Sequence, residues 1–315
     1  MLVNLVNFGL DIINHVKKFL FVFLIFSLLL AGCQAATTET SSDAAAEAYI
    51  QNKGSDTIVN LALAWAERYQ EEYPAVRISV TGGGSGTGLA SLINGTVDIA
   101  NASRAIKKEE IKEAEANGIE PVETVIARDA IAVIVNPHNP VNHLTLEQIS
   151  QIYRGEINNW SELGGEDRPI VRLSRETNSG THVYFLEQVI RLGQKENHEI
   201  FSADTLLLPS SEGIISEVRD NPNAIGYDGL GYVTEEVKVL GVAAKEGGEY
   251  VMPSIDSVNA GTYPIARDLY MYMRKDAGQA VLDYMQWILS PEAQTIVSDL
   301  GFVPVIVSNS QEGTP

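Results

Sequence analysis

Hydrophobic and polar positions follow two repeating patterns from residue 50 onward. Short apolar runs predict β-strands, and the clearest are "VRISV" at 76–80 and "AIAVIV" at 130–135. Segments with apolar residues three or four positions apart predict helices over residues 58–73, 107–118, 144–155 and 181–194. Strands that alternate with helices are typical of an α/β protein with mainly parallel sheets covered by helices.

The N-terminal segment follows another pattern. Lys17 and Lys18 precede "FLFVFLIFSLLL", an apolar run that is short for a transmembrane helix, and small residues lead to Cys33 in "LAGC". This order indicates an export signal over residues 1–32, and "LAGC" resembles the lipidation site of bacterial lipoproteins. A cleaved signal with an unrelated cysteine is the alternative. The small, polar and acidic residues 33–49 predict a flexible linker. We expect an exported protein, lipid-anchored to the outer face of the cytoplasmic membrane or periplasmic.

The charge of the chain narrows the choice of partner. The 22 basic and 41 acidic side chains fall to 20 and 40 when Asp11, Lys17 and Lys18 leave with the signal, which gives a net charge of about −20. No basic run is present, so nucleic acid is not an expected partner. A bound anion would therefore depend on a local site rather than on the overall field.

Residue types that perform catalysis or bind metals lack the required spacing. The only cysteine is Cys33, which leaves no disulfide framework and no thiolate cluster. The histidines outside the signal do not show metal-ligand spacing, and no Ser/His/Asp set can be assigned; they are His138, His143, His182 and His198. We expect a protein that is not an enzyme and that has no metal and no cofactor.

A glycine-rich turn, "TGGGSGTG" at 81–88, joins the strand at 76–80 to the helical pattern that begins near Leu89. Glycine adopts positive φ without strain and lets backbone N–H groups approach a ligand. Ser85 and Thr87 add hydroxyl groups. The turn predicts an anion cradle at a helix start, with a tight strand–helix connection as the alternative. The lysine of a P-loop and the context of a dinucleotide fingerprint are missing.

Two other helix starts repeat this composition: "NKGSDT" at 52–57 and "SRETNSGT" at 174–181. Three helix starts rich in Gly, Ser and Thr supply N–H donors, hydroxyls and partial positive charge, which favours a tetrahedral oxyanion as ligand. Arg175 adds a full charge, and its guanidinium fork matches two oxygens of a phosphate-like group. A surface salt bridge between Arg175 and Glu176 is the alternative.

Several motifs in order resemble one family. They are "GSDT", "GGGSGTGLASLINGTVDIANASR", "YRGEINNWSELGG", "RETNSGTHVYF", "NAIGYDGLGYV" and "AGTYPIARDLYMY". This set is similar to the phosphate-binding protein of bacterial phosphate ABC transporters, the PstS family, over about residues 53–307. The resemblance implies an α/β, two-lobed type II periplasmic-binding-protein fold with a central ligand cleft. One lobe would comprise residues 50–132 plus 255–315 and the other residues 133–254.

The resemblance also implies a function and a site. The ligand would be inorganic phosphate, the partners would be ABC transporter permease subunits, and we expect a monomer. Family positions that contact phosphate fall on Thr57, Ser85, Arg175, Ser179, Gly180 and Thr181, and Ser55 and Thr87 lie beside matched positions. The segments "YRGEINNWSELGG" and "NAIGYDGLGYV" are interpreted as structural, with Trp160 packed in the interior.

Two positions depart from the better-known family pattern. Arg104 and Thr177 stand where well-known members carry carboxylates. The group that accepts the proton of phosphate would then be Asp56 or Asp129, although Asp56 could merely cap its helix and Asp129 could pair with Arg104 or Arg128. Alternatives are therefore a binder of another tetrahedral oxyanion, such as sulfate or molybdate, or a phosphate-sensing or adhesion lipoprotein of the same fold.

Overall fold

The computed structural model describes residues 48–305, so the expected signal, Cys33 and most of the expected linker lie outside the described residues. The helices are α2 (Asp56–Glu72), α3 (Ser85–Ile93), α4 (Lys108–Ala116), α5 (Leu146–Arg154), α6 (Gly180–Phe185), α7 (Ser211–Asp220), α8 (Ile255–Asn259), α9 (Gln279–Ile288) and α10 (Pro291–Asp299), with the short 3-10 turns η1 (Trp160–Leu163) and η3 (Leu230–Tyr232) and the π turn η2 (Leu186–Ile190). None of the helices within this part of the chain combines the length and apolar character that a membrane span requires.

The strands are β1 (Ala48–Gly54), β2 (Val76–Thr81), β3 (Ile99–Ala102), β4 (Pro121–Val135), β5 (His143–Thr145), β6 (Val171–Arg175), β7 (Leu206–Leu208), β8 (Ala224–Gly229), β9 (Lys238–Val239), β10 (Gly241–Ala243), β11 (Ala266–Arg274) and β12 (Val303–Pro304). Within residues 48–305 a 10-stranded sheet has the order β2-β1-β3-β11-β4-β8-β6-β7, while β9 and β12 also pair with β4. Strands β5 and β10 form a separate pair.

Most predicted elements are confirmed. The apolar runs become β2 and the second half of β4, and three of the predicted helices correspond to α2, α4 and α5. The fourth prediction, a helix over residues 181–194, is too long. There α6 passes into η2, and the chain then adopts positive φ at Leu192 (53°) and Gly193 (68°), which ends the helix.

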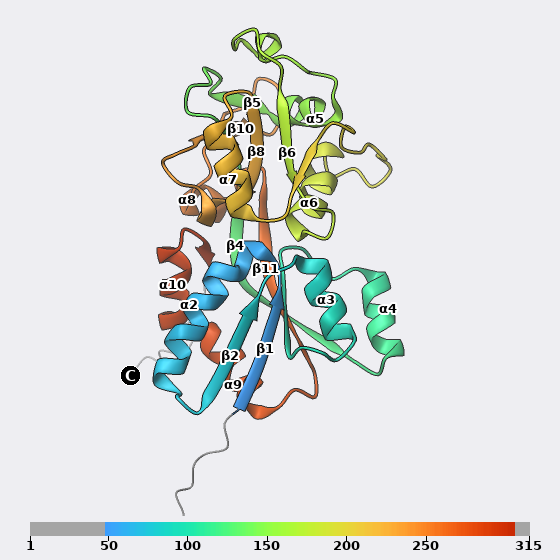
Figure 1. The fold of residues 1–315 in the computed structure, drawn as a ribbon, viewed down its shortest axis with the longest axis vertical. Helices are drawn as coiled ribbons and strands as arrows, with labels where there is room; N and C mark the ends of the chain where they lie inside the picture. Colours follow the sequence, from blue (N-terminus) through green and yellow to red (C-terminus); the bar gives the residue numbers. More distant parts are fainter. Residues whose placement is uncertain (1–47, 306–315) are drawn as a thin grey trace, which may run out of the picture. The chain divides into compact units, whose positions relative to one another are not determined.

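The expectation of mainly parallel sheets is wrong at the centre of the large sheet. Its outer pairs, such as β1 with β2 and β6 with β8, are parallel, but β11 is antiparallel to both β3 and β4, and β4 is antiparallel to β8. The reason is topological. The chain leaves the first lobe along β4 and returns along β11, and two neighbouring strands that carry the chain in opposite directions pair antiparallel (Figure 1).

The long strand β4 joins the two lobes of this type II periplasmic-binding-protein fold (Figure 1). It pairs with β11 from Pro121 to Ala130 and with β8 from Ile131 to Val135. In the second part, Ile134 packs into one apolar cluster while Ile131 and Val135 pack into another. A strand with both faces buried reads as a continuous apolar run, which explains "AIAVIV".

The segment "YRGEINNWSELGG" is structural, as interpreted from the sequence. Gly155 ends α5 with φ 79° and Gly164 ends η1 with φ 78°, a conformation that favours glycine. Trp160 is buried and donates its indole N–H to the carbonyl of Asn223 at 3.0 Å. Trp160 therefore packs in an apolar cluster of the second lobe, with Tyr153 and Ile170.

Candidate functional site

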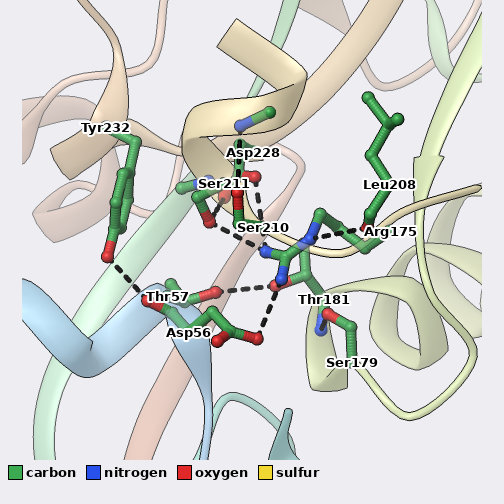
Figure 2. A network of polar contacts seen from close by, with 12 residues as sticks. Asp56, Thr57, Arg175, Ser179, Thr181, Leu208, Ser210, Ser211, Asp228 and Tyr232 are labelled. Atoms are coloured by element: carbon green, nitrogen blue, oxygen red, sulfur yellow. Dashed lines mark hydrogen bonds and ion pairs between the residues drawn. The ribbon is translucent and has the colours of Figure 1, made fainter. Parts of the chain in front are cut away.

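The starts of α2, α3 and α6 meet at one buried place. Thr57 in α2 and Thr181 in α6 place their hydroxyl oxygens 2.8 Å apart (Figure 2). Ser179 precedes α6, and its hydroxyl accepts the Thr181 N–H at 3.2 Å. A Cβ atom at Gly180 would lie 2.3 Å from Ser85 Oγ in α3, so only glycine fits there. The structure therefore brings together five residues that the sequence analysis assigned to the site.

Ser55 and Ser103 extend this group of hydroxyls. Ser55 Oγ donates to Ser103 Oγ at 2.9 Å, and the two hydroxyl oxygens of Ser85 and Ser103 lie 3.2 Å apart. A Cβ at Gly180 would lie 2.6 Å from Ser103 Oγ as well. Ser103 was not predicted from the sequence, although it stands directly before Arg104 at the end of a quoted motif. All three serines are buried.

Arg175 at the end of β6 lies among protein acceptors rather than at the surface (Figure 2). Its guanidinium donates to Asp56 Oδ2 at 2.9 Å and to Ser211 Oγ at 2.8 Å, and Nη1 is 3.6 Å from Asp228 Oδ2. The backbone carbonyls of Leu208 and Pro209 accept further bonds at 3.4 and 2.8 Å. The alternative pairing of Arg175 with Glu176 is therefore wrong.

Arg267 on β11 is a second buried arginine, which the sequence analysis missed. It stands directly opposite Asp129 in the antiparallel register of β11 and β4, and its Nε and Nη2 donate to Asp129 Oδ2 at 3.3 and 3.0 Å. Nη2 also donates to Thr181 Oγ1 at 2.9 Å and Thr57 Oγ1 at 3.4 Å. The quoted motif "AGTYPIARDLYMY" contains Arg267, but nothing local marked it as a site residue.

Two carboxylates at the site are fully buried and respond to that burial. Burial raises the pKa of Asp129 to about 6 against the opposing effect of Arg267. Burial also raises the pKa of Asp228, against the effect of Arg175. Asp228 lies in the segment "NAIGYDGLGYV", and its carboxylate faces Arg175 at 3.6 Å. Low-dielectric surroundings disfavour the charged form, which is the physical cause in both cases.

Asp129 pairs with neither alternative partner named by the sequence analysis. Arg104 forms an ion pair with Glu110, with Nη2 2.6 Å from Oε1, and Arg128 donates to the side chain of Asn259. Asp56 is the first residue of α2, and its Oδ1 accepts the N–H of Gly83 at 2.9 Å. The carboxylate of Asp56 thus bonds to a neighbouring turn and to Arg175 rather than only to its own helix.

The glycine-rich turn contacts the second lobe. The N–H of Gly86 donates to the carbonyl of Asn178 at 3.0 Å, and Asn178 Nδ2 donates to the carbonyl of Gly83 at 2.9 Å. At Gly84, whose φ is 89°, a Cβ would lie 2.8 Å from the carbonyl oxygen of Asn178. The N–H of Gly84 itself donates to the carbonyl of Gly54 at 2.9 Å. The interpretation of the turn as an amide cradle is wrong for the N–H groups of Gly83, Gly84 and Gly86, which have protein acceptors.

Thr87 and Arg104 lie at the margin of the site. Thr87 lies in the first turn of α3 and is half-buried, and its side chain lies toward Gly83. Arg104 lines a cavity of about 240 Å³ together with Arg267 and Tyr184, so the cavity has walls from both lobes. Tyr184 donates its hydroxyl to the carbonyl of Ala266 at 2.6 Å and stacks under the Arg267 guanidinium, 5.6 Å from ring centre to Cζ.

His182 lies in α6 and is held by neighbouring side chains. Its Nδ1 lies 3.0 Å from Ser174 Oγ, its ring stacks on Phe201, and burial lowers its pKa. Across residues 48–305 no group of three or more His, Cys, Asp and Glu side chains is arranged to hold a metal ion. The groups that meet at the site are hydroxyl and guanidinium donors beside buried carboxylates.

Comparison with known proteins defines the class first. A sequence profile of the PBP superfamily domain matches residues 39–292. The phosphate-binding protein PstS of Pseudomonas aeruginosa is 31% identical over 301 residues, covering 87% of this chain and 91% of the relative. PstS of Bacillus subtilis is 30% identical over 288 residues, covering 89% and 91%. A solved substrate-binding protein with bound phosphate from Clostridium perfringens is 33% identical, with a TM-score of 0.73 over 82% of this chain and 99% of that one. The chain belongs to the PstS family of phosphate-binding proteins.

Proposed function

We propose that this protein captures inorganic phosphate between its two lobes and delivers it to the permease subunits of an ABC transporter. The observation that carries the proposal is the buried contact of Thr57 with Thr181, beside Arg267, at the meeting point of three helix starts. Hydroxyl and guanidinium donors from two lobes suit a tetrahedral oxyanion that is enclosed on all sides. The names of the relatives and the phosphate bound to the Clostridium protein support phosphate as this anion.

The proposed phosphate contacts are those expected from the sequence. They are Thr57, Ser85, Arg175, Ser179, Gly180 and Thr181, with Ser55, Asp56, Thr87, Arg104 and Asp129 as secondary candidates. Arg175 is bonded to Asp56, so in this proposal it provides positive charge and also ties the second lobe to the start of α2. Thr87 and Arg104 contribute least, because one is half-exposed and the other is paired with Glu110.

We propose a first lobe of residues 50–132 plus 255–315 and a second lobe of residues 133–254. The change of partner in β4 between Ala130 and Ile131 supports a crossing close to the first of these limits. Helix α8 packs with the second lobe through Val258, and Ile265 belongs to the same apolar cluster. These contacts move the proposed second limit from residue 254 to about residue 265, at the start of β11, so that residues 255–264 join the second lobe.

We further propose that the protein is exported, monomeric and lipid-anchored through Cys33, since "LAGC" follows the apolar run of a signal. Replacing Cys33 by Ser removes the acyl acceptor while leaving the linker and domain unchanged. The variant should move from the membrane fraction to the soluble fraction with an unaltered melting temperature. Retention in salt-washed membranes would contradict the anchor.

One specific observation favours testing other oxyanions. Arg104 and Thr177 replace carboxylates of the better-known pattern, and the Asp56 and Asp129 carboxylates each accept hydrogen bonds from an arginine. A carboxylate accepts the proton of phosphate but faces a repelling lone pair on sulfate, so the position of a free acceptor decides selectivity. Binding of sulfate as tight as that of phosphate would make this protein a general oxyanion binder.

Calorimetric titration of the soluble domain, stripped of bound anion, tests the proposal. We expect saturable binding of phosphate, much weaker binding of sulfate and molybdate, and weak binding of a phosphate ester, because a closed site leaves no room for the ester group. No binding of any of these anions would contradict a transport role and favour a sensing or adhesion protein of the same fold.

A further inference from the structure

Arg267 occupies a position that differs from that of Arg175 in one decisive respect. Its Nη2 lies 2.9 Å from Thr181 Oγ1 and 3.4 Å from Thr57 Oγ1, and both threonines are proposed phosphate contacts. The side chain is buried, with 6% of its surface exposed. Arg267 therefore carries its charge directly to the hydroxyls where the lobes meet.

Arg175 also bonds to protein groups, but neither of the two threonines is among its acceptors. Four of its hydrogen bonds reach Asp56, Ser211, Leu208 and Pro209, and its Nη1 also faces Asp228 at 3.6 Å. A guanidinium has five N–H donors, and four of those of Arg175 have hydrogen-bond acceptors on the protein. The fifth, on Nη1, is on the side of the Asp228 carboxylate, so an anion that approached it would meet a buried acid.

The surroundings of Arg267 fix its orientation. Asp129 accepts from Nε and Nη2, the carbonyl of Ser103 accepts from Nη1 at 3.0 Å, and the Asp129 carboxylate is itself held by the N–H of Leu230 at 3.1 Å. The ring of Tyr184 lies under the guanidinium. A charged fork held on three sides is pre-organised, which lowers the entropy cost of using it for a ligand.

The bonds to the threonines also orient hydroxyl hydrogens. Thr57 and Thr181 share one hydrogen bond, and Arg267 donates into the oxygen of Thr181, so this oxygen already accepts. Each hydroxyl has one hydrogen, and the shared bond uses only one of the two. One threonine hydrogen therefore remains for an acceptor, and it lies beside the Arg267 charge.

We propose that Arg267 is a direct ligand of the bound oxyanion and determines its affinity, whereas Arg175 acts mainly by tying the lobes together through Asp56. This inference rests on the proposed function, because it names the charged group of the same site. The charge that contacts the anion then comes from Arg267 on β11, a strand of the first lobe. The sequence indicated such a charge only at Arg175, on β6 of the second lobe. Arg267 lies in the first lobe and bonds to Thr181 of the second. The complete set of donors around the anion therefore forms only when Thr181 is in place, which links the affinity for the anion to the closure of the lobes.

The first test removes the ion pair as a unit. Arg267→Gln with Asp129→Asn leaves no unpaired buried charge, and we expect phosphate affinity to fall at least about tenfold. Arg172→Gln is the matched control: Arg172 is also a buried arginine, on β6, but it pairs with Asp204 and contacts the carbonyl of Ile157, away from the threonines. We expect the control to lower the melting temperature and to keep the wild-type affinity.

Chemical rescue distinguishes a direct contact of Arg267 with the anion from a purely structural role of this residue. In Arg267→Ala, added guanidinium ions should restore part of the phosphate affinity, since the 240 Å³ cavity beside residue 267 offers them access. A merely structural role would change the melting temperature without this rescue. A crystal structure of the wild-type protein with phosphate tests the contact without any substitution. We expect Nη2 of Arg267 at hydrogen-bond distance from a phosphate oxygen.

The outcomes are distinct. Wild-type affinity in a folded double variant, or a phosphate-bound structure in which Arg267 is out of hydrogen-bond reach, overturns the inference and leaves the proposed function intact. Failure of the wild-type protein to bind any oxyanion overturns the proposed function instead. Loss of affinity in the double variant together with rescue by guanidinium supports both.

Discussion

At the scale of single residues, two arginines and two fully buried carboxylates share the centre of the protein. Arg267 and Asp129 face each other across two strands, and Arg175 faces Asp228 and Asp56. Removing one member of such a pair leaves an uncompensated buried charge, which costs more than the pair contributes. Substitutions at this site are therefore informative when both members change, when a neutral isostere is used, or when an added cation replaces the lost charge.

The raised pKa of Asp129 predicts a pH-dependent stability. Because burial raises this pKa from 3.8 to about 6, the folded protein binds the proton more tightly than the unfolded chain. The stabilisation is fully present below pH 4 and is lost as the pH rises through 6, by at most about 3 kcal/mol. Urea unfolding of wild type and Asp129→Asn from pH 4 to 8 measures it. The wild type should lose stability relative to the variant between pH 4 and 6 and run parallel to it above pH 7. Parallel curves throughout would contradict the assignment.

At the scale of elements, the turn before α3 is a surface for the other lobe. Gly84 has φ 89°, and the carbonyl of Asn178 lies where its Cβ would be, while the neighbouring Gly86 and Gly83 bond to Asn178. A side chain at this position would separate the lobes by the width of a methyl group. The glycines of "TGGGSGTG" are thus explained by close approach of backbone to backbone as well as by the start of a helix.

This interpretation predicts different results for two glycine substitutions. Gly84→Ala should weaken phosphate binding by about tenfold or more, because it strains the turn and blocks the contact with Asn178. Gly118→Ala is the control: Gly118 also has positive φ (73°), but a Cβ there meets nothing within 4 Å. The control should lose roughly 1 kcal/mol of stability and no affinity. Calorimetry measures the phosphate affinity of both variants. Equal affinities would show that the turn before α3 does not take part in the contact between the closed lobes.

At the scale of the whole molecule, the described lobes are in direct contact. Thr57 bonds to Thr181, Asp56 to Arg175, and the hydroxyl of Tyr232 donates to the carbonyl of Asp56 at 2.6 Å (Figure 2). An anion of several heavy atoms enters such a site only when the lobes separate. Hinge motion about β4 and the start of β11, where the sheet changes partners, would open it.

Because the lobes must separate to admit the anion, we expect the size of the protein to change when phosphate binds. Small-angle scattering should show a smaller radius of gyration with phosphate than after removal of bound anion, and the melting temperature should rise with phosphate concentration. Added free energy of unfolding amounts to about 2.7 kcal/mol at a concentration one hundred times Kd. Chloride at the same ionic strength is the control and should change neither quantity. An unchanged radius with confirmed phosphate binding would indicate a rigid cleft.

Local patterns in the sequence were sufficient for helices α2, α4 and α5, for strand β2 and the second half of β4, and for several hydroxyls of the site. Periodicity placed α2 and α5 because each buries one face of a helix, and the Ser and Thr residues at helix starts marked Thr57, Ser85 and Ser179. Such features depend on neighbours within a few positions of the chain. The same local patterns did not predict how segments far apart in the sequence pair, such as the antiparallel pairing of β4 with β11.

By itself, then, the sequence determined the α/β class, the helix starts rich in hydroxyls and the membership of a phosphate-binding family. The tertiary structure alone decided which charges meet those hydroxyls. Arg267 is 210 positions from Thr57, and Asp129 is 138 positions from Arg267, so nothing local links them. They meet because β11 inserts between β3 and β4, which sets Arg267 opposite Asp129 and directs its guanidinium toward the threonines. Strand pairing over such separations is set by the packing of the whole sheet, and no window of the sequence contains it.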